Sequence, residues 1–237
     1  MKHYLLFALL LISFSVLAQR FDTYNEAIDS VFRTRLTGES YFEKKGYKGE
    51  QYFNKQWMPG DIILSTGETV TNEKLKYNGL LDELIWVNGF INQQFKLDKS
   101  LISEFRLKNE QGQYNYFRHI TVPKPITNQP VDIFAELAVE GELSLFVQRK
   151  ISVTNVDEIA IDGVHYNQET IKATPVYYLK MLLGNYLLLD KIKLTSFIQL
   201  FPTQKKQITQ IIKSNNLKFK TEKDLIKLID ILNTHEF

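Results

Sequence analysis

The chain has 237 residues, of which 44% are hydrophobic and 13% aromatic, and its 29 basic residues nearly balance its 27 acidic residues. This balance excludes a strongly basic nucleic-acid-binding domain, because such a domain needs a basic face to displace the counterions of phosphates. The absence of cysteine excludes disulfides, thiolate nucleophiles and cysteine-based metal sites, so we expect no nucleic-acid partner, no cofactor, and stability that comes from the hydrophobic core.

The first 18 residues have the pattern of a secretory signal peptide. Lys2 supplies a basic start, an apolar stretch runs from Tyr4 to Ala18, and small residues precede a cut between Ala18 and Gln19. The apolar stretch is shorter than the about 20 residues that a bilayer core needs, so an uncleaved anchor is the less favoured alternative. We therefore expect a periplasmic protein, with outer-membrane association as an alternative and with no stable membrane span after cleavage.

Residues 19–48 are predicted to form a short N-terminal helix and a loop. Apolar residues between Phe21 and Leu36 recur near the spacing of 3.6 residues, which is typical of an amphipathic helix. The following stretch, Thr37–Lys48, is polar and aromatic and contains glycine, so we expect a loop there.

Residues 49–192 have the period-two pattern of an antiparallel β-meander. Glycine-containing turn sequences separate short β-prone runs at Ser65–Gly67, Asn88–Gly89, Gln111–Gly112, Glu140–Gly141, Asp162–Gly163 and Gly184–Asn185. Asn-Gly and Asp-Gly favour tight hairpins because both central residues there need positive φ. We expect roughly ten to twelve strands, and we interpret Gly60–Asn78 as a structural hairpin in preference to a ligand site.

A proline-rich stretch interrupts the predicted strands near the middle of the chain. Pro123, Pro125 and Pro130 cannot donate hydrogen bonds to a sheet ladder, so we expect an edge or connecting loop there. This loop is a candidate join between two sub-sheets, roughly Gln51–Ile120 and Val131–Asp190, and the sheet is predicted to be curved or two-part.

Residues 193–237 return to a helical period and predict two or three helices packed on the sheet, within a single globular domain of the α+β class. Pro202 is expected in the first turn of a helix that ends at Asn215-Asn216. Thr221 and Asp224 have the spacing of a capping box. The predicted buried positions are Ile208, Ile211, Ile212, Leu225, Leu228, Ile229 and Leu232. The lysines from Lys205 to Lys227 are expected to form a solvated face, with a phosphate-binding patch as the alternative.

No local motif predicts catalysis or metal binding. His119, His165 and His235 lack the spacing of a metal site, and the chain has neither a G-x-S-x-G elbow nor a glycine-rich phosphate loop. We therefore predict no catalytic, cofactor-binding or metal-binding residues. The absence of such motifs favours a non-enzymatic protein over an enzyme.

Aromatic residues give the best candidate for a binding surface. Trp57, Tyr77 and Trp86 belong to the first predicted sub-sheet, and Trp57 precedes a Pro-Gly turn. A tryptophan near a turn combines an apolar body with a polar N–H, which suits binding surfaces. The alternative is that Trp86 belongs to the core and Trp57 covers the end of the sheet.

Several segments together carry a family resemblance. They are "WMPGDIILSTGE", "LKYN" and "DELIWV" in the first half, and "GELSLFVQRK", "PVYYLK" and the helical tail in the second. With the exit "VLAQ", they resemble a group of uncharacterised exported proteins common in Bacteroidetes. The resemblance covers most of the mature chain and implies export and a similar fold, but no catalytic residues.

Three functions remain open at this stage. The first is an exported non-enzymatic envelope protein that binds an apolar ligand or an envelope protein through its curved sheet. The second is a small outer-membrane β-barrel, suggested by the terminal Phe237, although runs of about 5–8 residues are shorter than the 9–11 of a spanning strand. The third is a hydrolase in which dispersed residues converge, with His119, His165, Asp157 and Asp162 as the candidates.

Overall fold

A computed structural model describes residues 36–44, 46–124, 127, 129–162 and 164–234. The predicted signal peptide, its cleavage site and nearly all of the predicted N-terminal helix lie outside these residues. The first strands are β1 (Gly38–Ser40), β2 (Met58–Leu64), β3 (Thr69–Asn78), β4 (Glu83–Asn88) and β5 (Gln93–Leu97), followed by the short helix η1 (Lys99–Leu101). β1 lies within the stretch that was predicted to be a loop.

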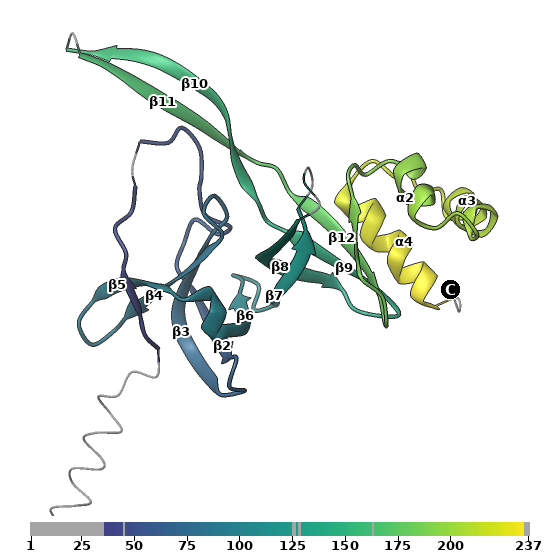
Figure 1. The fold of residues 1–237 in the computed structure, drawn as a ribbon, viewed down its shortest axis with the longest axis horizontal. Helices are drawn as coiled ribbons and strands as arrows, with labels where there is room; N and C mark the ends of the chain where they lie inside the picture. Colours follow the sequence, from purple (N-terminus) through teal and green to yellow (C-terminus); the bar gives the residue numbers. More distant parts are fainter. Residues whose placement is uncertain (1–35, 45, 125–126, 128, 163, 235–237) are drawn as a thin grey trace, which may run out of the picture. The chain divides into compact units, whose positions relative to one another are not determined.

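The later strands are β6 (Ile102–Lys108), β7 (Tyr114–Pro123), β8 (Pro130–Val139), β9 (Leu143–Gln148), β10 (Ile151–Ile161), β11 (Val164–Ala173), β12 (Val176–Met181) and β13 (Tyr186–Leu189). Eleven strands form one antiparallel sheet in the order β1-β5-β4-β3-β2-β6-β7-β8-β9-β12-β13, and β10 pairs with β11 in a second sheet (Figure 1). The sheets and the three described C-terminal helices confirm the α+β class.

The large sheet consists of two meanders that meet where β2 pairs with β6. Strands β2 to β5 follow one another in one direction, and the chain then returns through η1 so that β6 pairs with the free edge of β2. The predicted join at the proline-rich loop is therefore wrong. β7 and β8 pair up to Pro123 and Pro130, because prolines at the ends of a ladder stop the pairing of two strands without dividing the sheet.

All six predicted glycine turns join consecutive strands that pair antiparallel, so these hairpin predictions are confirmed. Asp162 has a φ of 51°, and Gly67 and Gly112 have φ values of 86° and 80°. These left-handed conformations suit Gly and Asp because a larger side chain would clash with the backbone. The hairpin β2–β3 contains Gly60–Asn78, so the predicted hairpin is present in this segment.

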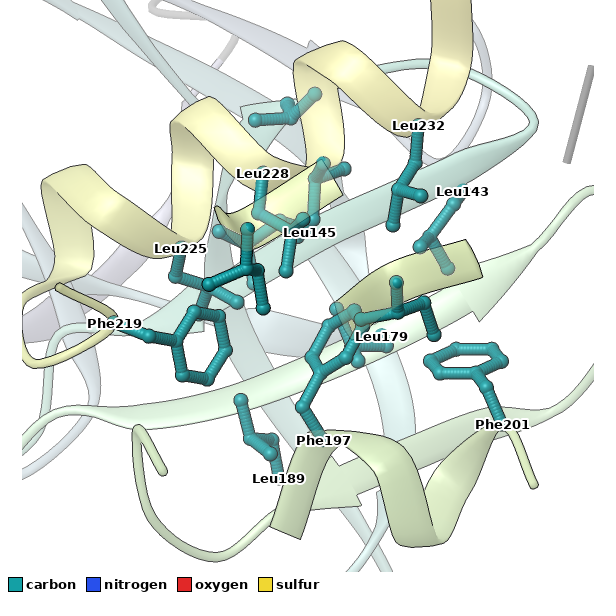
Figure 2. Packing of buried hydrophobic residues seen from close by; sticks show 14 of the residues in the cluster. Leu143, Leu145, Leu179, Leu189, Phe197, Phe201, Phe219, Leu225, Leu228 and Leu232 are labelled. Carbon is teal, nitrogen blue, oxygen red and sulfur yellow. The ribbon is translucent and has the colours of Figure 1, made fainter. Parts of the chain in front are cut away.

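The C-terminal helices cover one face of the sheet. They are α2 (Leu194–Leu200), α3 (Lys205–Ser214) and α4 (Glu222–Thr234). Figure 2 shows the leucines of α4 directed toward Leu143, Leu145 and Leu179 of β9 and β12, with the rings of Phe197 and Phe219 beside them. The predicted buried positions of α3 and α4 are all buried, which follows from the apolar stripe that each helix presents to the sheet.

The ends of these helices follow the sequence signals with one exception. The Thr221 hydroxyl accepts from the Asp224 N–H at 3.2 Å, and the Asp224 carboxylate accepts from the Thr221 N–H at 3.1 Å, so the capping box is confirmed. Asn216, just after α3, has a φ of 54° and ends that helix as expected. The prediction for Pro202 is wrong. α3 begins only at Lys205, because Phe201 is buried in the core and the chain must turn before the helix can start.

A charged cluster fastens α4 to the sheet. Arg149 donates to both carboxylate oxygens of Glu222 at 2.8 Å and also pairs with Glu136. Tyr177 donates its hydroxyl to Glu222 at 3.1 Å, and Asn115 donates to Glu136 at 2.6 Å. Burial, together with the neighbouring Glu222, raises the pKa of Tyr177 to about 12. Every carboxylate in the cluster has a donor, as a partly buried charge requires.

Candidate functional site

The structure does not gather the three predicted aromatic residues on one exposed surface. Tyr77 is fully buried, and Trp86 is 4% exposed with its indole N–H donating to Glu73 at 2.6 Å. Trp57 lies beside Lys76, whose ammonium is 5.3 Å from the indole ring. Because side chains alternate along a strand, Lys76 leaves β3 on the face opposite Tyr77, and Trp57 is therefore separated from the other two by the sheet.

Tyr77 belongs to a buried polar group that sequence reasoning missed. Its hydroxyl donates to Asp82 at 2.6 Å, Lys99 pairs with the same carboxylate, and the Phe134 N–H donates to it at 3.3 Å. Burial raises the pKa of Asp82, while Lys99 opposes this rise. Three donors contact the Asp82 carboxylate, and Phe105 and Phe134 pack against the Tyr77 ring, so the group stabilises the turn after β3.

A second polar network joins the end of β3 to the chain segment that precedes β2. The buried Asn78 donates to the Tyr41 hydroxyl at 3.3 Å and to the Gln51 side chain at 3.4 Å, and its oxygen accepts the Leu80 N–H at 3.0 Å. Nearby, Tyr52 donates to Glu43 at 3.0 Å, and burial raises the pKa of Tyr52.

A polar hollow of about 310 Å³ opens beside this network, lined by Glu43, Lys44, Gly46, Tyr47, Gly49, Glu50 and Gln51. Its carboxylates already have partners within the chain, since Glu43 accepts from Gln51 and Tyr52, and Glu50 accepts from the Tyr52 N–H. The arrangement fixes the course of the loop and offers few unsatisfied groups to a ligand.

The candidate hydrolytic residues are divided between the two sheets. His119 on β7 packs against Phe134, with 5.7 Å between the ring centroids, and its buried Nε2 has no hydrogen-bond partner among the described residues. His165 on β11 is exposed and lies 2.8 Å from Glu158, and Asp157 accepts from Asn155. In the part of the chain that the structure describes, no three metal-binding side chains come together.

The least ordinary feature of the fold is the hairpin β10–β11. Its register runs from Ile151 opposite Ala173 to Ile161 opposite Val164, and it is joined to the rest of the protein near its base. There Ile151 and Ile171 are buried, the Ile151 N–H donates to Gly79, and the Lys48 backbone pairs with β11. We call residues 156–169, from Val156 to its ladder partner Glu169, the arm. Figure 1 shows the arm extending away from β12 and the helices.

Apolar side chains on the arm remain exposed. Val156, Val164 and Tyr166 are each about half exposed (51–52%). The pairing of Ile159 with Tyr166 places Val164, two residues from Tyr166, on the same face of the ribbon. A two-stranded ribbon without a core is marginally stable in water, and exposed apolar residues grouped on such a ribbon mark a surface that meets a partner.

The arm is also acidic. It contains Asp157, Glu158, Asp162 and Glu169 and neither lysine nor arginine. Glu169, the last residue of the arm, pairs with Lys44 at 3.9 Å. The sequence predicted this hairpin from Asp162-Gly163 but not its departure from the sheet. The available signal was that both faces of β10 and β11 carry polar residues, which is unsuitable for a strand with one face on a core.

Comparisons with protein-family models, curated proteins and solved structures find no match for this chain. The candidate site therefore stands on its own geometry. Among the described residues, no helix has the length and apolar character to cross a membrane.

Proposed function

We propose that this chain is an exported, non-enzymatic protein of the cell envelope that binds another macromolecule through the arm. The single observation that carries the proposal is a long ribbon with exposed apolar residues on a fold whose other strands are paired in one sheet. Strand edges that are left unpaired invite pairing or packing with another chain.

Export rests on the sequence pattern of the first 18 residues and on the resemblance to exported Bacteroidetes proteins. Periplasmic residence is the location we propose, because after cleavage the chain carries no further apolar stretch of membrane-spanning length. Cell fractionation tests this directly: mature protein in the periplasmic fraction is expected, and full-length protein in the cytosol would contradict it.

Site-specific photo-crosslinking in the native cell tests the role of the arm. A photoreactive phenylalanine analogue replaces Tyr166, and a matched protein carries it at Tyr116, an equally aromatic residue on β7 that is 40% exposed. We expect adducts of defined mass at position 166 and few or none at position 116. Equal labelling at both positions, or none at either, would contradict a docking role for the arm.

A shortened chain provides an independent check. Asn-Gly replaces residues 157–168 and joins Val156 to Glu169, which already face each other across the ladder as the residues flanking the natural turn do. This short-arm variant keeps the buried base of the hairpin, so we expect it to fold and no longer to co-purify with the partner that is crosslinked at position 166 of the full-length arm. A folded short-arm variant that still engages the same partner would exclude the arm as the binding element.

A further inference from the structure

The net charge of the chain is concentrated in two segments. The arm carries four acidic residues and no lysine or arginine, whereas residues 190–234 carry nine lysines and four acidic residues. All other residues together have 20 basic and 19 acidic side chains. A nearly neutral protein thus separates a negative ribbon from a positive helical segment, and such a separation directs association between molecules more than it stabilises a fold.

The positive segment presents a lysine stripe along α3. Lys205, Lys206 and Lys213 are all exposed and, with Thr209, line a shallow hollow of about 560 Å³. These positions repeat every three to four residues, so they share the side of the helix opposite the buried Ile208. Among the described residues, the three helices contribute to an ion pair only through Glu222, which binds Arg149. No carboxylate in the part of the chain that the structure describes pairs with the lysine stripe.

The negative segment has matching features. Asp157 and Glu158 lie on opposite faces of the ribbon, and Asp162 is at its tip. Half-exposed Val164 and Tyr166 lie beside them and can bury apolar area against the aliphatic parts of lysine side chains. Figure 1 shows strands β10 and β11 of the arm extending away from α3, which favours contact between two molecules.

We infer that the occupant of the arm is a second copy of this chain, and that the acidic arm of one molecule docks on the lysine stripe of α3 in the next. This inference rests on the proposed function, because it names the partner of the same arm. The two surfaces are different, so the contact is head-to-tail and each added molecule leaves one arm and one lysine stripe free. The association is accordingly open-ended or closes into a ring, and it weakens with added salt.

Charge reversal on each surface tests the inference. The stripe variant carries Lys205→Glu, Lys206→Glu and Lys213→Glu, and the arm variant carries Asp157→Lys, Glu158→Lys and Asp162→Asn, which leaves Glu169 as its one acidic residue and makes the arm positive. Sedimentation velocity of the wild-type protein at low salt is expected to show mass that grows with concentration and falls as salt is added. Each variant alone is expected to associate about tenfold more weakly or not at all, because its two surfaces then carry like charges.

An equimolar mixture of the two variants gives the decisive result. In the mixture the arm of each variant faces a stripe of opposite charge, so association is expected to return to the wild-type level. Circular dichroism melting curves equal to the wild type ensure that the loss in each separate variant is not unfolding. A monomeric wild-type protein at every concentration, or a mixture that stays dissociated, would overturn the inference.

The outcome also separates this inference from the proposed function. Crosslinked adducts at position 166 with twice the mass of the chain support self-association. Adducts with a different mass, together with a monomeric wild-type protein, would reject the second copy as the occupant and leave the docking role of the arm in place. If the lysine stripe binds vesicles of anionic lipid while the protein stays monomeric, the stripe serves a membrane surface and the inference fails.

Discussion

Two regions that are neighbours in the chain both consist of antiparallel strands joined by tight turns, but one region is covered by helices and the other is exposed. The helix-covered strands, β9, β12 and β13, pack one face against α2, α3 and α4. The hairpin β10–β11 lies between β9 and β12 in the chain but leaves the sheet and exposes both of its faces. Both regions have strong turn residues and β-prone sequences. The difference is that only the first has an apolar face that can be covered, so burial decides which strands remain in the body of the fold.

The largest contrast is expected from introducing a charge in each region. Leu228→Asp places a carboxylate without a partner between α4 and the sheet, where Leu228 is fully buried, and should cost about 4 kcal/mol or more. Val156→Asp, the matched change on the half-exposed arm, should stay within about 0.5 kcal/mol. Chemical denaturation of both variants measures the free energy of unfolding. Equal losses would mean that the arm is as well packed as the helix face.

The next largest difference in stability between the two regions is expected when one positively charged residue in each is replaced by methionine. Arg149→Met leaves Glu136 and Glu222 without their shared guanidinium and should lower the free energy of unfolding by about 2–3 kcal/mol, since the pair is mostly buried. Lys172→Met, at an exposed position on β11, should have little effect on stability. Thermal melts compare the two. If Arg149→Met is as stable as the wild type, the cluster does not hold α4 on the sheet.

The free energy of unfolding should depend on pH through the Asp82 carboxylate, which lies in the turn after β3. Burial raises the pKa of Asp82 above its ordinary value of 3.8, so the folded state holds the proton more tightly than the unfolded state. The contribution of Asp82 to the free energy of unfolding is therefore largest below about pH 4 and decreases as the pH rises through the folded-state pKa.

Urea denaturation from about pH 4 to about pH 7 checks this sign when wild type is compared with Asp82→Asn. The stability difference, wild type minus variant, should become less favourable to the wild type as the pH rises. A difference that grows with pH would show that Lys99 outweighs burial and lowers the folded-state pKa.

The smallest effect is expected from removing the arm. The short-arm variant retains the buried Ile151 and Ile171 and every contact of the helix-covered strands, so its stability should match the wild type within about 0.5 kcal/mol. Hydrogen exchange in the wild-type protein provides a second measurement. The amides of residues 157–168 in the full-length arm should exchange much faster than those of β9 and β12. Slow exchange of these amides in the monomeric wild-type protein would mean that the arm is more rigid than a two-stranded ribbon is expected to be.

Sequence reasoning identified the elements better than their arrangement. The glycine turns, the capping box at Thr221 and the buried stripe around Leu228 are local signals, and the structure has all of them where expected. The return of the chain between β5 and β6 carries no comparable signal, because any strand edge of the right polarity can accept a partner. The proline-rich loop has the same ambiguity, because prolines can mark either a break between two sheets or the end of one pair of strands, and here they end the pairing of β7 with β8.

The candidate site was missed where local and tertiary information diverge. Tyr77 and Trp86 have the composition of a binding surface, and only the register of β3 and β4 shows that both point into the core. The Tyr77–Asp82–Lys99 group needs contacts with β8 that no spacing predicts. The sequence identifies the arm as a hairpin, but its departure from the sheet depends on whether either of its faces can be covered by the core, which local turn signals do not give.

The way the hairpin is rooted makes it a natural point of insertion. Its two ends are held together by the Thr174 N–H donating to Lys150 at 2.8 Å and by the hydroxyls of Ser152 and Thr174, 2.7 Å apart. The chain therefore leaves and re-enters the body at one place. A foreign domain whose termini lie close together can be grafted there with little loop-closure cost and without disturbing β9 or β12, which makes this root a practical site for a fluorescent or affinity module.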